Sequence, residues 1–144
     1  MKIALVQMDV VHGQPVENKK HVIEMLERAL DHNPDVIVLP EMWNTGYALN
    51  ELDGLADKAG LDSQELLSHF ATKYAVAIIG GSVAIEKDGK FYNTTYVYNK
   101  SGDLINTYSK AHLFGLMAED QYMSAGSNES VFEVDGVISS SVIC

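Results

Sequence analysis

The sequence is poor in cysteine, in basic residues and in long apolar runs. One cysteine occurs among 144 residues, so no disulfide can form within the chain, and we expect a reducing, cytoplasmic location. Only 10 Lys and Arg stand against 20 Asp and Glu, which gives a formal charge of -10. Such a surface repels nucleic acid and anionic membranes, and no apolar run approaches the length of a membrane span or a signal peptide. We therefore expect neither nucleic acid nor a membrane as a partner.

Alternating strands and helices are predicted for the first part of the chain. Residues 2–7 predict a strand, and residues 17–31 carry apolar side chains at helical spacing. Residues 36–39 form an apolar run that is too short for a helix and too apolar for a half-exposed strand, so a strand buried on both faces is predicted. This β-α-β opening favours a parallel pair with a right-handed crossover, and a fold of the α/β class.

A second helix and a series of shorter strands are predicted next. Asp62 or Ser63 can cap a helix that runs to about Tyr74. The residues that follow favour strands separated by Gly80-Gly81 and by tight turns at residues 86–90 and 100–103; these strands cover residues 76–85, 91–99 and 104–108. Consecutive hairpins after a β-α-β opening predict a mixed sheet, or two stacked sheets, with helices outside.

Residues 137–144 predict one more buried strand, which would end on Cys144. A buried strand in an α/β fold is normally followed by a loop and a covering helix. We therefore expect the single domain formed by residues 1–144 to be incomplete and to continue beyond residue 144.

Three reactive side chains follow predicted strands. Glu41 comes after Leu39 and Pro40, Lys110 follows the strand of residues 104–108, and Cys144 ends the last strand. Buried strands of such sheets deliver the residues at their carboxyl ends into a crevice. A thiol, a carboxylate and an ammonium group brought together there would provide a nucleophile, a proton acceptor and a cationic stabiliser for an oxyanion. This combination is typical of acyl transfer from an amide or a nitrile.

Each of these residues also has a purely structural explanation. Glu41 could cap the next turn or stay solvated, Cys144 could be a small core residue, and Lys110 could lie on the surface. His112 could act as a base beside the cysteine, although a supporting or surface position is more common for such a histidine. The other histidines fall in loops and on helices at no ligand spacing, so we expect no metal site.

Four short motifs occur in a fixed order along the entire chain: Ile3-Ala-Leu-Val-Gln7, Leu39-Pro-Glu41 with Gly46-Tyr47, Tyr108-Ser-Lys-Ala-His-Leu113 with Glu119 and Gly126, and Val142-Ile-Cys144. Each motif is common by itself, whereas their order and relative spacing are specific. In this arrangement the chain resembles the amino-terminal half of a carbon-nitrogen hydrolase of the nitrilase superfamily.

The resemblance implies a fold, a catalytic triad and an assembly. The implied fold is an α-β-β-α sandwich, of which this chain would be the amino-terminal half, and such subunits usually pair as homodimers. The resemblance therefore also implies that a polypeptide of these 144 residues alone is inactive, because half of the core would be missing. Glu41 matches the general base, Lys110 the residue that stabilises the tetrahedral intermediate, and Cys144 the nucleophile. Glu119 matches a second glutamate that holds the lysine, and His112 lies in the lysine motif as a supporting residue. No metal or organic cofactor is implied.

The loops around these motifs indicate a substrate class. Residues 42–47 and 113–119 look similar to the branch of the family that hydrolyses small ω-amides, such as the keto-amides left after glutamine transamination. Trp43, Tyr47 and Met117 are candidates for lining the substrate pocket. Related branches act on N-carbamoyl amines, deaminated glutathione or nitriles. Two hypotheses from other classes stay open: a non-catalytic fragment that pairs with intact subunits, and a redox-responsive protein with Cys144 as its sensor.

Overall fold

A computed structural model describes residues 1–144 and is built around a seven-stranded mixed sheet. Its strand order is β1-β2-β4-β6-β5-β3, and β7 pairs with β6. Three parallel strands form one side of this sheet: β1 (Ile3–Leu5), β2 (Val36–Val38) and β4 (Ala77–Ile79). The other strands of the sheet are β3 (Asp57–Lys58), β5 (Val83–Lys87), β6 (Lys90–Tyr98) and β7 (Leu104–Ser109). A separate two-stranded sheet contains β8 (Val131–Val134) and β9 (Val137–Ser140).

The longest strand, β6, connects the two halves of the main sheet. It pairs antiparallel with β4, β5 and β7. Val97 of β6 faces Ile79 of β4 on one edge and Asn106 of β7 on the other, and β5 continues along the edge that β4 occupies. The chain turns from β5 into β6 at Asp88 and Gly89, both at positive φ. This geometry suits a two-residue hairpin turn, so the turn predicted at residues 86–90 is confirmed.

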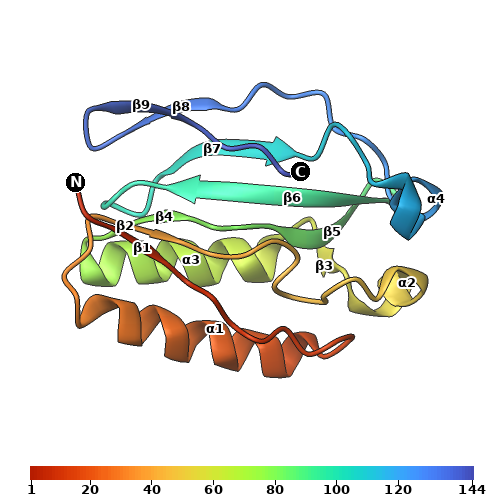
Figure 1. Cartoon of the computed structure of the whole chain (residues 1–144), viewed down its shortest axis with the longest axis horizontal. Coiled ribbons are helices and arrows are strands. Elements are labelled where there is room, and N and C mark those ends of the chain that lie inside the picture. The colour runs from red at the N-terminus through yellow and green to blue at the C-terminus, as the bar shows by residue number, and fades with distance from the viewer.

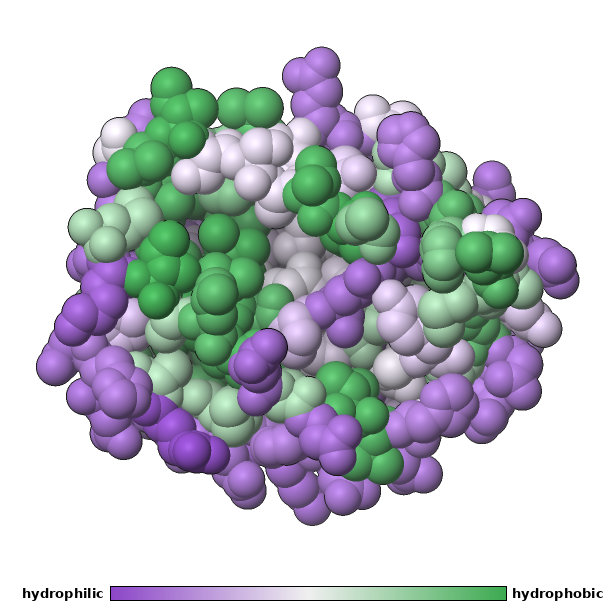
Figure 2. Space-filling model, in the orientation of Figure 1, coloured by the Kyte–Doolittle hydropathy of each residue, from purple (hydrophilic) through white to green (hydrophobic).

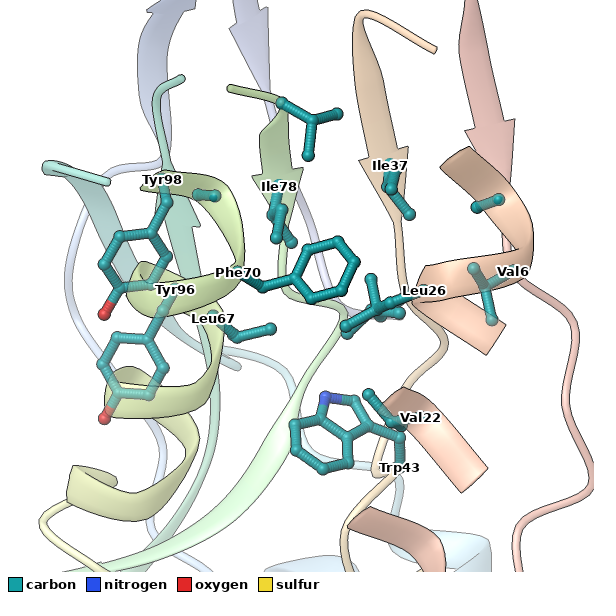
Figure 3. Close-up of a cluster of buried hydrophobic side chains, with 14 of the residues drawn as sticks. Val6, Val22, Leu26, Ile37, Trp43, Leu67, Phe70, Ile78, Tyr96 and Tyr98 are labelled. Atoms are coloured by element: carbon teal, nitrogen blue, oxygen red, sulfur yellow. The ribbon is translucent and has the colours of Figure 1, made fainter. Parts of the chain in front are cut away.

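Two helices cover one face of the sheet (Figure 1). Helix α1 (Pro15–Leu30) begins with proline, whose fixed φ and missing N–H suit a first helical position. Helix α3 (Leu61–Tyr74) packs beside it, and the buried apolar residues of both helices join residues of the sheet in a core cluster of 16 residues, most of which Figure 3 shows. The short helical segments are η1 (Leu49–Glu51), α2 (Leu52–Leu55), η2 (Gly115–Met117) and α4 (Glu119–Tyr122).

The β8–β9 hairpin covers the opposite face of the main sheet (Figure 1). Phe132 and Val134 of β8 are buried in a cluster that contains Val36 of β2. The adjacent residue of β2, Ile37, belongs to the core on the helix side. Because neighbouring residues of a strand point to opposite faces, β2 is buried on both faces, as its apolar sequence predicts. The fold is therefore mixed α/β, with helices, main sheet and hairpin as successive layers.

The start of α3 differs from the prediction. Neither Asp62 nor Ser63 is the N-cap; that position belongs to Gly60, which has a φ of 68° and no side chain to cap the helix. The carboxylate of Asp57 instead accepts hydrogen bonds from the backbone N–H groups of Asp62 and Ser63, at 3.2 and 2.8 Å. The first turn of α3 is thus satisfied by an acid from the preceding strand β3.

Residues 137–144 do not form one buried strand, which corrects a second prediction. Strand β9 ends at Ser140, and the residues after it have no regular structure. Ile138 is 79% exposed, because the hairpin packs on the main sheet through Phe132 and Val134 of β8. Asp135 and Gly136, both at positive φ, form the hairpin turn between β8 and β9. This Asp-Gly pair is a turn signal, but the prediction followed the apolar residues after it.

Apolar and polar side chains divide the surface unevenly. In Figure 2, hydrophobic residues gather on the left of the view, where β1 and the β8–β9 hairpin lie in Figure 1, and hydrophilic residues line the side of helix α1. Ile3 and Leu5 of β1 are 53% and 75% exposed. None of the helices combines the length and the apolar character that crossing a bilayer would require.

Candidate active site

Glu41 follows β2 in a loop that packs closely against the connection between β4 and β5. The backbone N–H of Ser82 donates to the carbonyl oxygen of Pro40 at 3.1 Å, and the Ser82 hydroxyl oxygen accepts from the N–H of Met42 at 3.0 Å. Gly81 has a φ of 58°, and a Cβ at this position would collide with the Pro40 carbonyl group. Only glycine therefore permits the close approach that fixes the backbone on both sides of Glu41.

Lys110 follows β7 and points into the protein. Its side chain is 1% exposed, so the surface alternative for this lysine is wrong. The backbone N–H of Lys110 donates to the carbonyl oxygen of Asn93 on β6 at 2.8 Å, and its own carbonyl oxygen accepts from Gly126 at 2.9 Å. A side chain at Gly126 would collide with the backbone of Ser109. Strand β6 and the Gly126 loop thus hold the backbone of Lys110 from both sides.

Two glutamates bind the buried ammonium group. Lys110 Nζ lies 3.1 Å from Oε1 of Glu41 and 2.8 Å from Oε2 of Glu119. Glu119 is the first residue of α4, and its side chain is 0% exposed. Its Oε2 also accepts a hydrogen bond from the backbone N–H of Phe114 at 2.8 Å. Glu41 is partly exposed, with 31% of its side chain accessible. One positive charge therefore faces two negative charges, of which only the Glu41 charge reaches solvent.

Burial and hydrogen bonding act in opposite directions on these groups. Burial lowers the pKa of Lys110, but the hydrogen bonds to Glu119 and Glu41 outweigh it and hold that pKa above its ordinary value. Burial raises the pKa of Glu119, but hydrogen bonds from Lys110, from the Phe114 N–H and from Asn93 outweigh it and hold that pKa below its ordinary value. Lys110 and Glu119 are therefore both charged at neutral pH.

Asn93, which the sequence analysis did not single out, joins the two carboxylates. Its Nδ2 group donates to Glu41 Oε1 at 2.9 Å and to Glu119 Oε1 at 3.2 Å. Asn93 lies inside β6 and is 0% exposed, and its Oδ1 has no hydrogen-bond partner. The only signal in the sequence is one amide among the Tyr and Thr residues of a predicted strand, which is too common to indicate a site.

Cys144 and Glu41 line the same cavity. This cavity has a volume of about 400 Å³, and Leu39, Ser82 and Thr95 also line it. Cys144 is exposed, and no hydrogen bond joins it to Glu41 or Lys110. The structure thus brings the predicted carboxylate and ammonium group into direct contact, and it places the thiol in the cavity that the carboxylate lines.

Residues 2–144 match the family model described as carbon-nitrogen hydrolase. The chain belongs to the carbon-nitrogen hydrolase family. A relative named 2-oxoglutaramate amidase, from Bacillus subtilis (strain 168), is 48% identical over 142 residues, which are 99% of this chain and 54% of that protein. Omega-amidase NIT2-B of Xenopus laevis is 31% identical over 92% of this chain and 50% of its own length. The chain spans about half the length of the curated relatives it matches.

Solved structures of the nitrilase superfamily share the fold. Nit3 of Saccharomyces cerevisiae, a member of branch 10 of that superfamily, superimposes with a TM-score of 0.89 at 26% identity, over 100% of this chain and 55% of Nit3. The CN-hydrolase superfamily protein XC1258 from Xanthomonas campestris, solved with an arsenic adduct in its active site, gives a TM-score of 0.85 at 26% identity, over 95% and 50% of the two chains. The fold implied by the sequence motifs is therefore confirmed.

Two of the residues expected to line the substrate pocket follow Glu41 in sequence. Tyr47 is half-buried beside it, and burial together with the Glu41 charge raises the pKa of the Tyr47 hydroxyl. Trp43 is 2% exposed in the core on the helix side (Figure 3), where its indole N–H donates to the carbonyl oxygen of Gly80 at 2.9 Å. Neither Tyr47 nor Trp43 lines the cavity shared by Glu41 and Cys144, and the pocket positions expected for them stay predictions.

Two other candidates lie in the loop between β7 and α4. His112 is exposed, and its ring makes no hydrogen bond with Glu41, Lys110 or Glu119. Met117, in η2, is 46% exposed and does not line the cavity. The supporting role expected for His112 and the pocket position expected for Met117 therefore stay predictions.

Proposed function

We propose that the complete gene product is an amidase that hydrolyses the C–N bond of a small linear amide to an acid and ammonia. The observation that carries this proposal is the buried Lys110 ammonium group, held by Glu41 and Glu119 next to the cavity that Glu41 and Cys144 line. The relatives named 2-oxoglutaramate amidase and omega-amidase support ω-amides of keto acids as the substrates. Glu41 is the proposed base, Lys110 the stabiliser of the oxyanion and Cys144 the nucleophile.

In the first half of the reaction, Cys144 attacks the amide carbon. A thiolate is the reactive form and a free thiol is mostly protonated at neutral pH, so Glu41 accepts the thiol proton as the S–C bond forms. The carbonyl oxygen becomes an anion, whose charge the nearby Lys110 ammonium group offsets. When the tetrahedral intermediate collapses, the C–N bond breaks and the leaving nitrogen takes the proton from Glu41. Ammonia departs, and an acyl thioester remains on Cys144.

In the second half, water hydrolyses the thioester. Glu41, again a carboxylate, takes a proton from the water molecule as its oxygen attacks the thioester carbon. Lys110 stabilises the second oxyanion in the same way as the first. Collapse breaks the C–S bond, and the proton on Glu41 passes to the sulfur of Cys144. The acid leaves, and the thiol is restored without a change in the charge of Glu119, which holds Lys110 throughout.

The charge of the cavity limits which end of the substrate enters it. Glu41 is the only Asp or Glu that lines the cavity, and no Lys or Arg lines it. A substrate carboxylate beside Glu41 would be repelled, whereas a neutral carboxamide can donate hydrogen bonds to it. The neutral amide end of a keto-amide therefore faces Cys144, and its acidic end is bound by groups outside this cavity.

Ammonia release by the complete gene product tests this function. The panel contains 2-oxoglutaramate, a simple aliphatic amide, an N-carbamoyl amine, deaminated glutathione and a nitrile, each assayed with wild type and with Cys144→Ala. We expect the highest kcat/KM for 2-oxoglutaramate, by roughly tenfold or more over the other compounds, because contacts to the second polar end add discrimination. Absence of ammonia from every compound, or equal release by the alanine variant, would contradict the proposal.

We further propose that the gene product is a cytoplasmic homodimer. The support for pairing is membership of a family whose subunits usually associate, and the support for the location is the use of a single, unpaired cysteine. Light scattering on the purified gene product should give twice the mass of one polypeptide. A monomeric mass at micromolar concentration would contradict the dimer.

A further inference from the structure

The amide group of Asn93 contacts both carboxylates of the ion cluster. Its Nδ2 lies 2.9 Å from Oε1 of Glu41 and 3.2 Å from Oε1 of Glu119, so each of its two N–H bonds has an acidic acceptor. Oε1 of Glu41 also accepts a hydrogen bond from Lys110 Nζ at 3.1 Å. One carboxylate oxygen of Glu41 is thus held by a charged donor and by a neutral donor.

Charge balance explains why an amide suits this position. Lys110 supplies one positive charge to two carboxylates. Two carboxylates that share a site tend to keep a proton between them, unless additional donors stabilise the second negative charge. A second lysine at position 93 would neutralise Glu41 and weaken it as a base, and an aspartate would add repulsion. Asparagine donates two hydrogen bonds without changing the charge of the cluster.

We propose that Asn93 is a positioning residue for the amidase reaction, which keeps Glu41 ionised and fixes the orientation of its carboxylate. This role rests on the proposed function, in which Glu41 accepts the proton of Cys144. Asn93 is 0% exposed and does not line the cavity, so it touches neither the substrate nor the thiol. Asn93 therefore affects the reaction indirectly. It holds the carboxylate of Glu41, and it holds Glu119, which in turn binds Lys110.

The unpaired oxygen of Asn93 separates this role from a purely structural one. A buried polar atom without a partner disfavours folding, and Oδ1 of Asn93 is such an atom. Asn44 illustrates the structural alternative, because its Oδ1 accepts from the N–H of Ala84 at 2.9 Å and its Nδ2 donates to the Ala84 carbonyl at 3.0 Å. Asn44 uses both ends of its amide to join two backbone segments, whereas Asn93 directs its donors at two charged side chains.

Glu41 faces titratable groups from several elements. These groups are Lys110 after β7, Glu119 of α4, Tyr47 of the loop that follows Glu41, and Cys144 in the shared cavity. A substitution of Asn93 alone changes none of these four residues. A change in the acidic limb of the pH profile in an Asn93 variant therefore reports the contribution of this amide.

The pH dependence of two reactions tests the role of Asn93 in the complete gene product. The first is kcat/KM for ammonia release, and the second is alkylation of Cys144 by iodoacetamide, followed by the mass of the Cys144 peptide, which needs no substrate. Leucine at position 93 keeps the approximate volume and removes both donors, while aspartate adds a third carboxylate. We expect the acidic midpoint of both profiles to move to higher pH, by about one unit in Asn93→Leu and further in Asn93→Asp.

The division between kcat and KM sharpens this expectation. Because Asn93 does not line the cavity, KM should stay within about twofold of wild type, and kcat should recover as the pH rises past the displaced midpoint. Asn106→Leu is the matched control, since Asn106 lies on the neighbouring strand β7, also has an unpaired buried Oδ1, and makes no hydrogen bond with either glutamate. Its profiles should keep the wild-type midpoint.

Three further results would decide whether Asn93 has the proposed role. Unmoved midpoints of both profiles in both Asn93 variants would overturn the role. Should Asn93→Leu fail to fold, the midpoint of Asn93→Asp decides alone. If the wild type releases no ammonia but the alkylation midpoint still moves in the Asn93 variants, the effect of Asn93 on Glu41 stands. The amidase function is then the part that is rejected.

Discussion

The two ends of the candidate site differ in how the protein holds them. At one end, Lys110, Glu119 and Asn93 are almost completely buried and are joined by hydrogen bonds and an ion pair. At the other end, Cys144 is exposed. Glu41 connects the two, because it contacts the buried cluster and lines the cavity that contains the thiol. The charged groups are therefore fixed by the main sheet, while the position of the thiol depends on the segment after β9.

Burial gives this difference an energetic consequence. Removing one partner of a buried ion pair leaves the other charge uncompensated and typically costs about 3–5 kcal/mol. Replacing an exposed side chain away from such features usually changes the free energy of unfolding by less than about 0.5 kcal/mol. Substitutions at the exposed end should therefore remove activity without affecting the fold, and substitutions at the buried end should affect both.

Cys144→Ala should produce the largest loss of activity. Without the nucleophile no thioester can form, and kcat/KM should fall by about 10⁴-fold or more. The free energy of unfolding should remain within about 0.5 kcal/mol of wild type, because the thiol is exposed. Ammonia release and urea unfolding measure the two quantities. A strongly destabilised alanine variant would contradict the expected difference in stability between the exposed thiol and the buried ion cluster.

Lys110→Met should lower activity and stability together. Methionine fills a similar volume, but it leaves Glu119 buried without its cationic partner, and the free energy of unfolding should fall by about 3–5 kcal/mol. Activity should be lost as well, because the proposed stabiliser of the oxyanion is gone. Urea unfolding followed by circular dichroism gives the stability. Wild-type stability in this variant would mean that the ion cluster does not hold the fold.

Glu119→Gln should change how stability depends on acid pH. The pKa of Glu119 is held below its ordinary value of 4.5, so its ionised form stabilises the fold above that pH, and this contribution is lost as the pH falls through the lower, folded-state value. Between about pH 5 and pH 3 the wild type should therefore lose more unfolding free energy than Glu119→Gln does. The raised pKa of Lys110 affects stability only at alkaline pH, so it does not disturb this test. Parallel curves for the two proteins would contradict the expectation.

Lys58→Ala should have the smallest effect. Lys58 and Glu86 form an ion pair at 2.6 Å, but the lysine side chain is 76% exposed. Water screens such a pair, so the free energy of unfolding should change by less than about 1 kcal/mol. Comparison with Lys110→Met then isolates burial as the factor that makes the ion pairs of Lys110 important for stability. A loss as large as that of Lys110→Met would show that burial is not the cause.

Sequence patterns predicted the parts of the site that follow strand ends. Glu41 comes after the buried strand β2 and Lys110 comes after β7, and both side chains meet as expected from strands of one sheet. Their roles in catalysis stay predictions until the variants are measured. The hairpin at residues 86–90 was also predictable, since Asp-Gly is a local signal for a two-residue turn.

The wrong or missing predictions depend on contacts between distant residues. Asn93 lies inside a strand, and only the fold brings it to Glu41 in the loop after β2 and to Glu119 at the start of α4. The acid that caps α3, Asp57, belongs to the preceding strand and not to the start of the helix. The run of residues 137–144 was taken as buried from its apolar composition, which cannot reveal whether another layer of the protein covers β9.

An acid-quenched reaction with 2-oxoglutaramate, analysed by the mass of the peptide that contains Cys144, tests the central claim most directly. The complete gene product should carry on Cys144 an acyl group equal to the substrate minus ammonia during turnover, and this adduct should be absent from Cys144→Ala. Ammonia release without any adduct on Cys144, or an adduct on a different residue, would contradict the thioester mechanism and the assignment of Glu41, Lys110 and Cys144.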